Sequence, residues 1–99
     1  MQRPKRRDRY IAFEFSEARF GREVAAAIRA AFAGRPAGER AEIIFFAGRR
    51  GLVRCAHTQA EEVTRALNAM RVGGSSVPVR TVGTSGTIRA ARARYFSKP

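Results

Sequence analysis

The middle of the chain, residues 41–56, reads AEIIFFAGRRGLVRCA. Its first seven residues form an apolar run of strand length, and the Gly-Arg-Arg-Gly at 48–51 is a compact turn signal. Residues 52–56 then form a second segment of strand length, so the pattern predicts a β-hairpin. The segments on either side of this hairpin complete the prediction of the fold.

A strand and a helix are predicted before the hairpin. From residue 10 to residue 15 apolar side chains alternate with others, as in a half-buried strand. Ser16 is a good N-cap, and apolar residues follow it at helical spacing until the glycines and proline of 34–38 form a loop. The side chains expected to face the core are Ile11, Phe13 and Phe15 from the strand, and Phe20, Val24, Ala27, Ile28, Ala31 and Phe32 from the helix.

The residues after the hairpin predict a helix, a strand and a last helix. Residues 58–61 (TQAE) match a capping box, in which the threonine and the glutamate satisfy each other's backbone amides. Two glycines at 73–74 end that helix. Residues 77–82 form the fourth strand, and Pro78 favours a sheet edge because proline cannot donate a ladder hydrogen bond. A short helix over residues 88–95 follows.

The predicted order is therefore β-α-β-β-α-β with a C-terminal helix. This is an α+β fold of the ferredoxin-like class: a four-stranded antiparallel sheet with two helices on one face and the other face open. The RNA-recognition motif has the same architecture. The 99 residues suit one domain. We expect residues 1–8 to be a disordered basic arm and residues 9–99 to be a single RNA-binding domain.

Positive charge is concentrated at the two ends of the chain. The net charge is +12, of which residues 80–99 carry +5 without any acid and residues 1–9 carry +4. Charge in blocks is typical of proteins that bind a polyanion. No apolar run approaches the roughly 18 residues of a membrane-spanning helix. The sequence thus favours nucleic acid over a membrane.

Few residues could carry out chemistry. The single cysteine, Cys55, excludes an internal disulfide, fits a cytoplasmic protein and is interpreted as a buried apolar residue rather than a nucleophile. His57, the only histidine, is interpreted as a partly exposed residue before the second helix; the alternatives are a proton shuttle or an RNA contact. No acidic residues or histidines have metal-ligand spacing. We expect no catalytic residue, metal site or bound cofactor in this chain.

Residues 84–87 (TSGT) are interpreted as a phosphate-binding turn. Gly86 permits a tight backbone path, the hydroxyls can cap or donate, and the free amides of the following helix attract anions. The neighbouring Arg80, Arg89 and Arg92 favour this reading over a plain helix cap.

The base-stacking platform of the RNA-recognition motif is missing. The third strand has no aromatic residue, and Tyr10 is the only aromatic that the pattern places on the open face. Binding is therefore expected through phosphates and shape, with little base readout. The residues predicted to contact RNA are Arg3, Lys5, Arg6, Arg7, Arg9, Arg49, Arg50, Arg54, Arg80, Thr84, Ser85, Gly86, Thr87, Arg89, Arg92 and Arg94.

The strand over residues 41–47 is apolar on both faces. Phe45 and Phe46 are adjacent, so they point to opposite sides of the sheet. Such a strand implies cover by the terminal helix or by a protein partner. The residues predicted to contact a partner are Ile44, Phe45 and Phe46.

Three stretches of the chain resemble the small protein subunit of archaeal and eukaryotic ribonuclease P, the family of ribonuclease P protein component 2. Residues 9–15 (RYIAFEF) are similar to the family's opening strand. Residues 51–55 (GLVRC), with EEV at 61–63 and AL at 66–67, are similar to its third strand and second helix. Residues 79–89 (VRTVGTSGTIR) are similar to its C-terminal signature, which is the most specific of the three.

The resemblance implies a non-catalytic subunit of the endoribonuclease that removes 5′ leaders from precursor tRNA. The RNA would perform the hydrolysis with bound magnesium, while the protein binds that RNA and raises the cleavage rate. The implied partners are ribonuclease P RNA, a TIM-barrel-like protein subunit and, indirectly, precursor tRNA. Two copies of each protein can form a heterotetramer that contains a homodimer of this chain. Residues 34–40 are shorter than the family's self-association segment, which weakens the case for the homodimer.

Two other functions fit parts of the sequence. One is a general module for structured RNA, such as a ribosome-associated protein. The other is an enzyme on the same fold, such as an acylphosphatase. The enzyme needs a phosphate-cradling loop after the first strand and a catalytic asparagine, whereas the only asparagine, Asn68, falls in the predicted second helix.

Overall fold

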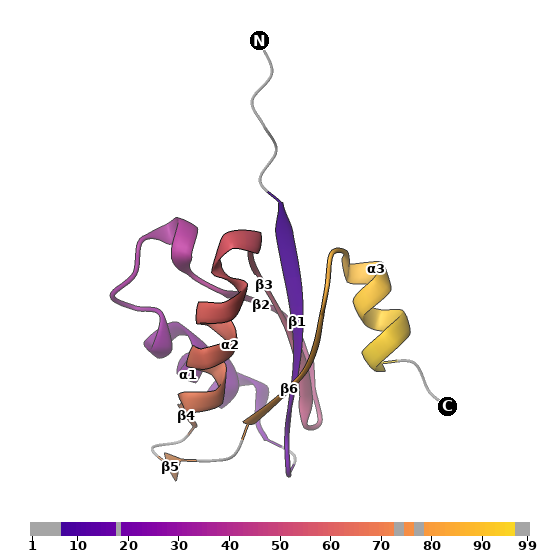
Figure 1. The fold of residues 1–99 in the computed structure, drawn as a ribbon. Helices are drawn as coiled ribbons and strands as arrows, with labels where there is room; N and C mark the ends of the chain where they lie inside the picture. The colour runs from indigo at the N-terminus through magenta and orange to yellow at the C-terminus, as the bar shows by residue number, and fades with distance from the viewer. Residues whose placement is uncertain (1–6, 18, 73–74, 77–78, 97–99) are drawn as a thin grey trace.

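A computed structural model of the chain describes residues 7–17, 19–72, 75–76 and 79–96 (Figure 1). None of the helices in these residues is long and apolar enough to cross a membrane. In chain order the elements are β1 (Asp8–Phe15), α1 (Gly21–Ala31), the 3-10 turn η1 (Ala37–Glu39), β2 (Glu42–Ala47), β3 (Arg50–Ala56), the 3-10 turn η2 (His57–Gln59), α2 (Ala60–Ala69), the short strands β4 (Arg71–Val72) and β5 (Ser75–Ser76), β6 (Val79–Ser85), α3 (Ile88–Ala91) and its π-helical continuation η3 (Arg92–Phe96).

The main sheet has the order β2-β3-β1-β6, and each neighbouring pair is antiparallel. Helices α1 and α2 lie on one side of it, and α3 lies on the other (Figure 1). This confirms the predicted α+β, ferredoxin-like fold. Strand β6 is at an edge, as Pro78 suggested, although Pro78 itself falls outside the described residues. The small β4–β5 hairpin was not predicted, since two-residue strands leave no periodic pattern.

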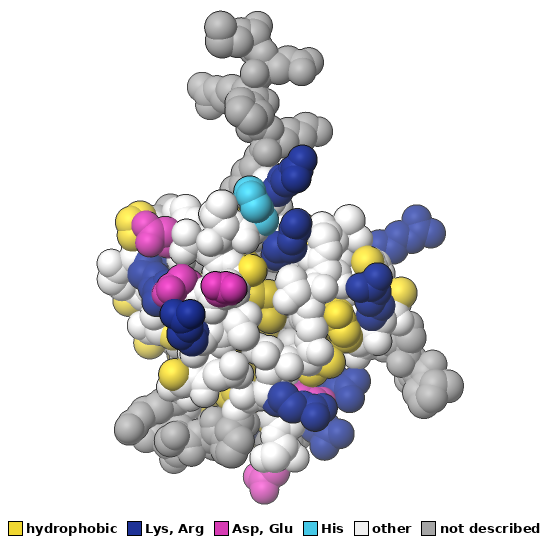
Figure 2. All heavy atoms as spheres, in the orientation of Figure 1, with side chains coloured by type: hydrophobic (Ala, Val, Ile, Leu, Met, Phe, Trp, Pro, Cys, Tyr) yellow, Lys and Arg dark blue, Asp and Glu magenta, His cyan; other side chains and the backbone are white. Residues whose placement is uncertain are grey.

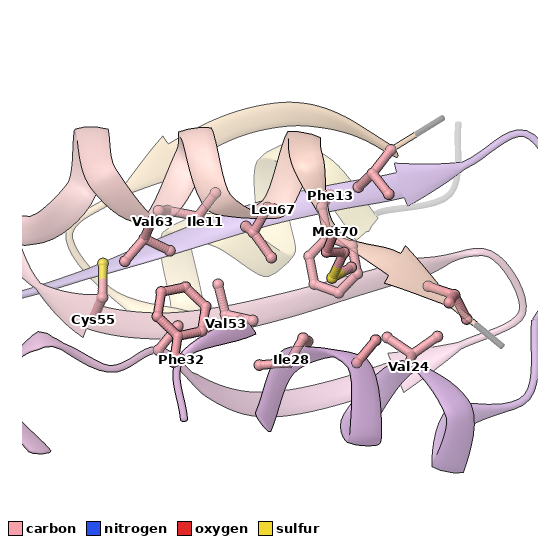
Figure 3. Packing of buried hydrophobic residues seen from close by; sticks show 14 of the residues in the cluster. Ile11, Phe13, Val24, Ile28, Phe32, Val53, Cys55, Val63, Leu67 and Met70 are labelled. Carbon is pink, nitrogen blue, oxygen red and sulfur yellow. The ribbon is translucent and has the colours of Figure 1, made fainter. Parts of the chain in front are cut away.

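The main core fills the space between the sheet and the helices α1 and α2 (Figure 3). The alternation of β1 sends three apolar side chains into it, with Phe13 in edge contact with Phe15 and stacked on Phe46 of β2. Ring-centroid distances in these two pairs are 6.0 and 6.1 Å. The side chains buried in this core include Ile11, Phe13, Phe15, Val24, Ile28, Phe32, Val53, Cys55, Val63 and Leu67.

Helix α1 begins at Gly21, five residues after the predicted cap at Ser16. The reason is tertiary, because the chain after β1 stays hydrogen-bonded to the hairpin turn. The amide of Phe15 donates to the carbonyl of Arg49 at 2.8 Å, and the amide of Arg19 donates to that of Gly48 at 3.0 Å. The predicted core position of Phe20 is therefore wrong: this side chain is 68% exposed.

The predicted capping box at 58–61 does not form. A 3-10 turn occupies residues 57–59, and α2 begins at Ala60 without a side-chain cap. The amide of Ala60 donates instead to the carbonyl of His57, and the amide of His57 donates to the carbonyl of Arg7 at 2.8 Å. Backbone carbonyls thus accept from the amides of His57 and Ala60 at this helix start.

A second apolar cluster lies on the opposite face of the sheet, under α3. Ala12, Leu52 and Ala91 are at most 1% exposed. The prediction of an open face is therefore wrong, because α3 and η3 cover it. Seven half-buried side chains complete this cluster: Tyr10, Ile44, Phe45, Val82, Ile88, Tyr95 and Phe96.

The two clusters account for the doubly apolar strand β2. Phe46 packs on the main core, while Phe45 meets Phe96 of η3 edge-on, with ring centroids 4.8 Å apart. Of the two alternatives posed by the sequence, cover by the terminal helix is the one that the structure contains. Contact of Ile44, Phe45 and Phe46 with a protein partner stays a prediction.

Candidate nucleic-acid interface

The C-terminal helix packs on the sheet and exposes arginines to solvent. Thr87 begins it as an N-cap, and its Oγ1 accepts a hydrogen bond from the amide of Ala90 at 3.1 Å. Ala91 faces the sheet and is fully buried. Arg89 and Arg94 are exposed, so the helix carries positive charge on the side away from its apolar contact.

Arg92 is held differently from the other two arginines of this helix. Its guanidinium carbon lies 4.9 Å from the centroid of the Phe45 ring, a cation–π contact. The two residues and Phe96 line a shallow hollow beside α3. Arg92 therefore helps to attach the helix to β2 as well as adding charge.

The predicted TSGT turn is shorter than expected. Thr84 and Ser85 belong to β6, and only Gly86 and Thr87 connect that strand to α3. Ser85 is 5% exposed, and its Oγ has no hydrogen-bond partner among the described residues. Gly86 does not have a positive φ, and a Cβ there would lie 4.0 Å from Arg9 Nη1, so a tight backbone path does not require glycine here. RNA contact by these residues stays a prediction.

Within the described residues, the start of β1 and the start of α3 come together in space. Tyr10 of β1 pairs with Ser85 of β6, so the start of β1 lies beside the start of α3 (Figure 1). Arg7 is exposed, while Arg9 is half-buried and donates from Nη1 to the carbonyl of Asp8 at 3.2 Å. Arg3, Lys5 and Arg6 lie outside the described residues.

The strand arginines are paired with acids. Arg54 of β3 donates to Glu42 of β2 at 2.5 Å. Arg50 of β3 and Arg80 of β6 both bond Glu14 of β1, the first at 2.9 Å. The positive charge of these three predicted RNA contacts is therefore partly neutralised by the neighbouring carboxylates.

Glu14 is the least exposed acid in these ion pairs, with 11% of its side chain accessible. Burial alone would raise its pKa, but the hydrogen bonds and charges of Arg50 and Arg80 outweigh it and hold the pKa below its usual value. Glu14 is therefore ionised at neutral pH. The identity of its arginine partners depends on the strand register.

Charge is distributed unevenly over the surface. Figure 2 shows Arg side chains beside the histidine at one end of the sheet and again at the hairpin end, with several acids on the side of α1 and α2; both lysines lie outside the described residues. The acids on that side include Glu39 of η1 and Glu61 and Glu62 of α2. After Glu62 the chain has no acid at all.

The described residues include no group of three His, Cys, Asp or Glu side chains that could hold a metal. Cys55 is fully buried in the main core, as predicted. His57 is exposed, with Nδ1 3.1 Å from the carbonyl of Arg7. Asn68 is on α2, as predicted, and not in the segment that follows β1.

Comparison with known proteins finds a matching family and a similar curated protein. The model of the Rpp14/Pop5 family matches residues 9–96. The chain is also similar to ribonuclease P protein component 2 of Methanosarcina barkeri, with 30% identity over 56 residues. This second match covers 56% of the chain and 42% of the relative, so the chain spans less than half the length of that curated relative.

Proposed function

Because the chain belongs to the Rpp14/Pop5 family, we propose that it is a non-catalytic protein subunit of ribonuclease P. In this role it binds the catalytic RNA and aids removal of 5′ leaders from precursor tRNA. The observation that carries the proposal is the family match over residues 9–96, which spans the domain from β1 to η3. The similarity to a ribonuclease P protein component supports it.

The surface supports binding to RNA through phosphates. Arg89 and Arg94 are exposed on the C-terminal helix, and Arg7 is exposed beside the start of β1. Arginine forks match phosphate oxygens, and each phosphate neutralised releases counterions from the RNA. The aromatic residues Tyr10, Phe45 and Tyr95 are packed in the cluster under α3 rather than spread on an open sheet, which favours phosphate and shape readout over base stacking.

The chain contributes electrostatics rather than a reaction centre. Hydrolysis is assigned to the RNA and its magnesium ions, while neutralisation of crowded phosphates favours the compact RNA that cleaves fast. The implied protein partner is a TIM-barrel-like subunit, with a homodimer of this chain in a heterotetramer as the larger assembly. Contact with that partner at β2 would use the exposed parts of Ile44, Phe45 and Phe46, all of which are half-buried.

The test is cleavage of precursor tRNA by a ribonuclease P RNA at limiting magnesium, with the TIM-barrel-like subunit present and with or without this chain. We expect faster 5′ cleavage with the chain and none without RNA. The double variant Arg89→Ala/Arg94→Ala should lose part of the stimulation. Arg29→Ala/Arg65→Ala is the matched control, because it also removes two charges, from exposed positions on α1 and α2.

Two outcomes would contradict the proposal. If the chain leaves cleavage unchanged but binds ribonuclease P RNA and unrelated structured RNAs equally well, it is a general RNA-binding module. If it binds none of these RNAs, the RNA-binding function itself is wrong.

A further inference from the structure

Two arginines form ion pairs with one carboxylate at the hairpin end of the sheet. Glu14 on β1 is directly opposite Arg50 on β3 and Arg80 on β6. Arg50 Nε donates to Oε2 of Glu14, and Arg80 Nη2 donates to Oε1. Each carboxylate oxygen thus holds one guanidinium.

The two arginines differ in what else they do. Arg50 also donates from Nη1 to the carbonyl of Tyr95 at 3.0 Å, so it joins the sheet to η3. The Arg80 side chain is 74% exposed. A guanidinium has five N–H donors, and the bond to Glu14 uses one, so Arg80 keeps donors for a ligand.

A hollow of about 330 Å³ lies beside these ion pairs. Arg80 lines it together with Arg49 of the exposed hairpin turn and Ser16 at the end of β1. Phe15, Val79 and Glu14 complete the lining. Two arginines and a hydroxyl around a space larger than a phosphate group suit a phosphodiester, to which arginine can donate two parallel bonds.

The single acid does not prevent anion binding there. Arg49, Arg50 and Arg80 carry three positive charges against the one negative charge of Glu14, so the local balance is +2. The same acid fixes the direction of a long side chain that would otherwise have to be ordered on binding. The net effect of Glu14 on anion binding is therefore a competition between repulsion and positioning.

We propose that this hollow binds one backbone phosphate of RNA between Arg49 and Arg80, and that Glu14 is a positioning residue that holds the Arg80 guanidinium ready for it. The inference rests on the proposed function, that the chain binds RNA. It adds a contact at the opposite end of the sheet from the meeting of β1 and α3. The RNA would then extend along the sheet from one charged end to the other.

Glu14→Gln distinguishes repulsion of the phosphate by Glu14 from positioning of Arg80 by Glu14, because the two predict opposite changes in RNA affinity. Removing a negative charge should tighten RNA binding if repulsion dominates. If Glu14 positions Arg80, the variant should instead bind ribonuclease P RNA about 2- to 10-fold more weakly, the cost of ordering one flexible side chain. Glu42→Gln is the matched control, because it removes the same charge from the pair with Arg54 on the same sheet; we expect unchanged or tighter binding.

The affinity for RNA falls as salt rises. Arg80→Ala and Arg49→Ala should each make the plot of log affinity against log salt less steep, by about 0.7–0.9 between about 50 and 200 mM salt. In an Arg80→Ala background, Glu14→Gln should no longer weaken binding, a result that a purely structural role for Glu14 would not give. Circular dichroism checks folding; both arginine variants change exposed side chains, so they test the site even if Glu14→Gln fails to fold.

The inference is overturned if Arg49→Ala and Arg80→Ala keep the wild-type affinity and salt slope. The positioning role is overturned if Glu14→Gln tightens binding as Glu42→Gln does, or weakens it equally in the Arg80→Ala background. In these cases the wild type still binds RNA, so the proposed function stands. If the wild type itself does not bind, both fail.

Discussion

The ring of Tyr95 packs directly on the backbone of Gly83. A Cβ added at Gly83 would lie 2.6 Å from Cε1 of Tyr95 and closer still to its hydroxyl, so only glycine leaves room for the ring. The carbonyl of Tyr95 also accepts a hydrogen bond from Arg50 Nη1 at 3.0 Å. Two strands, β6 and β3, therefore hold the end of η3, and the predicted RNA-binding helix depends on both contacts.

Gly83→Ala should force the Tyr95 ring away from β6. Overpacking of this kind costs about 1–3 kcal/mol, and we expect urea unfolding to show a loss of that size. Gly34→Ala is the control, since a Cβ at Gly34 would meet nothing within 4 Å. In a Tyr95→Ala background the added cost of Gly83→Ala should largely disappear. Equal costs in both backgrounds would show that the two residues are not coupled.

Gly51→Ala probes the main core in the same way. Its Cβ would lie 2.5 Å from Cζ of Phe13 and 2.8 Å from Cδ1 of Phe46. Both rings are held by Phe15, so neither can move without loss of packing. We expect a cost of about 1–3 kcal/mol in the free energy of unfolding. Gly38→Ala, where a Cβ meets nothing within 4 Å, should be close to neutral.

The sheet order and the main core could be predicted because their signals are local. Alternation over residues 10–15 and helical spacing from Val24 to Phe32 each place apolar side chains on one face. The start of α1 could not be predicted from local signals. The helix begins only at Gly21 because Phe15 and Arg19 donate hydrogen bonds to a turn some 30 residues away. Such tertiary bonds override the local preference for a cap at Ser16.

The position of α3 could not be predicted either. A glycine within a strand, such as Gly83, is typical of a bulge or a close approach, but it does not identify Tyr95 as the neighbour. The partners of Glu14 depend on a register shift in the β1–β6 pair between Ala12 and Phe13, which brings Arg80 opposite Glu14. Gly83 lies at this shift, but a glycine does not determine which side chains the shift brings together, so the ion pairs follow only from the structure.

Glu14 should make stability depend on pH in mild acid. Its pKa is lowered in the folded state because Arg50 and Arg80 outweigh the effect of burial, whereas in the unfolded chain a glutamate titrates near about 4.3. A lowered folded pKa gives stability that is fully present above the unfolded pKa and is lost as the pH falls through the folded pKa. The free energy of unfolding should therefore decline below about pH 5.

The comparison that isolates Glu14 is the pH profile of Glu14→Gln, measured by urea unfolding. This variant cannot titrate at residue 14, so its profile should be flatter in that range than that of the wild type. Glu42→Gln serves as the control, because Glu42 is 60% exposed and its pair with Arg54 is screened by solvent. A Glu14→Gln profile parallel to the wild type would show that other carboxylates cause the decline.

Ala91→Leu should detach α3 while leaving the main core folded. Ala91 is fully buried beside Ala12 and Leu52, where a larger side chain has no space. We expect faster trypsin cleavage at the helix arginines, a stability loss of about 1–3 kcal/mol and weaker binding to ribonuclease P RNA. Ala93→Leu is the matched control, because Ala93 is exposed on the continuing helix and does not belong to the buried cluster under α3.

The RNA-binding result separates two roles of this helix. If α3 must be docked for its arginines to meet phosphates in the right positions, Ala91→Leu lowers both the affinity and the salt slope, although every charge is retained. If cleavage by trypsin rises but affinity and slope match those of Ala93→Leu, the helix acts only as a flexible source of charge. That outcome would contradict a preformed interface built on Gly83, Tyr95 and Ala91.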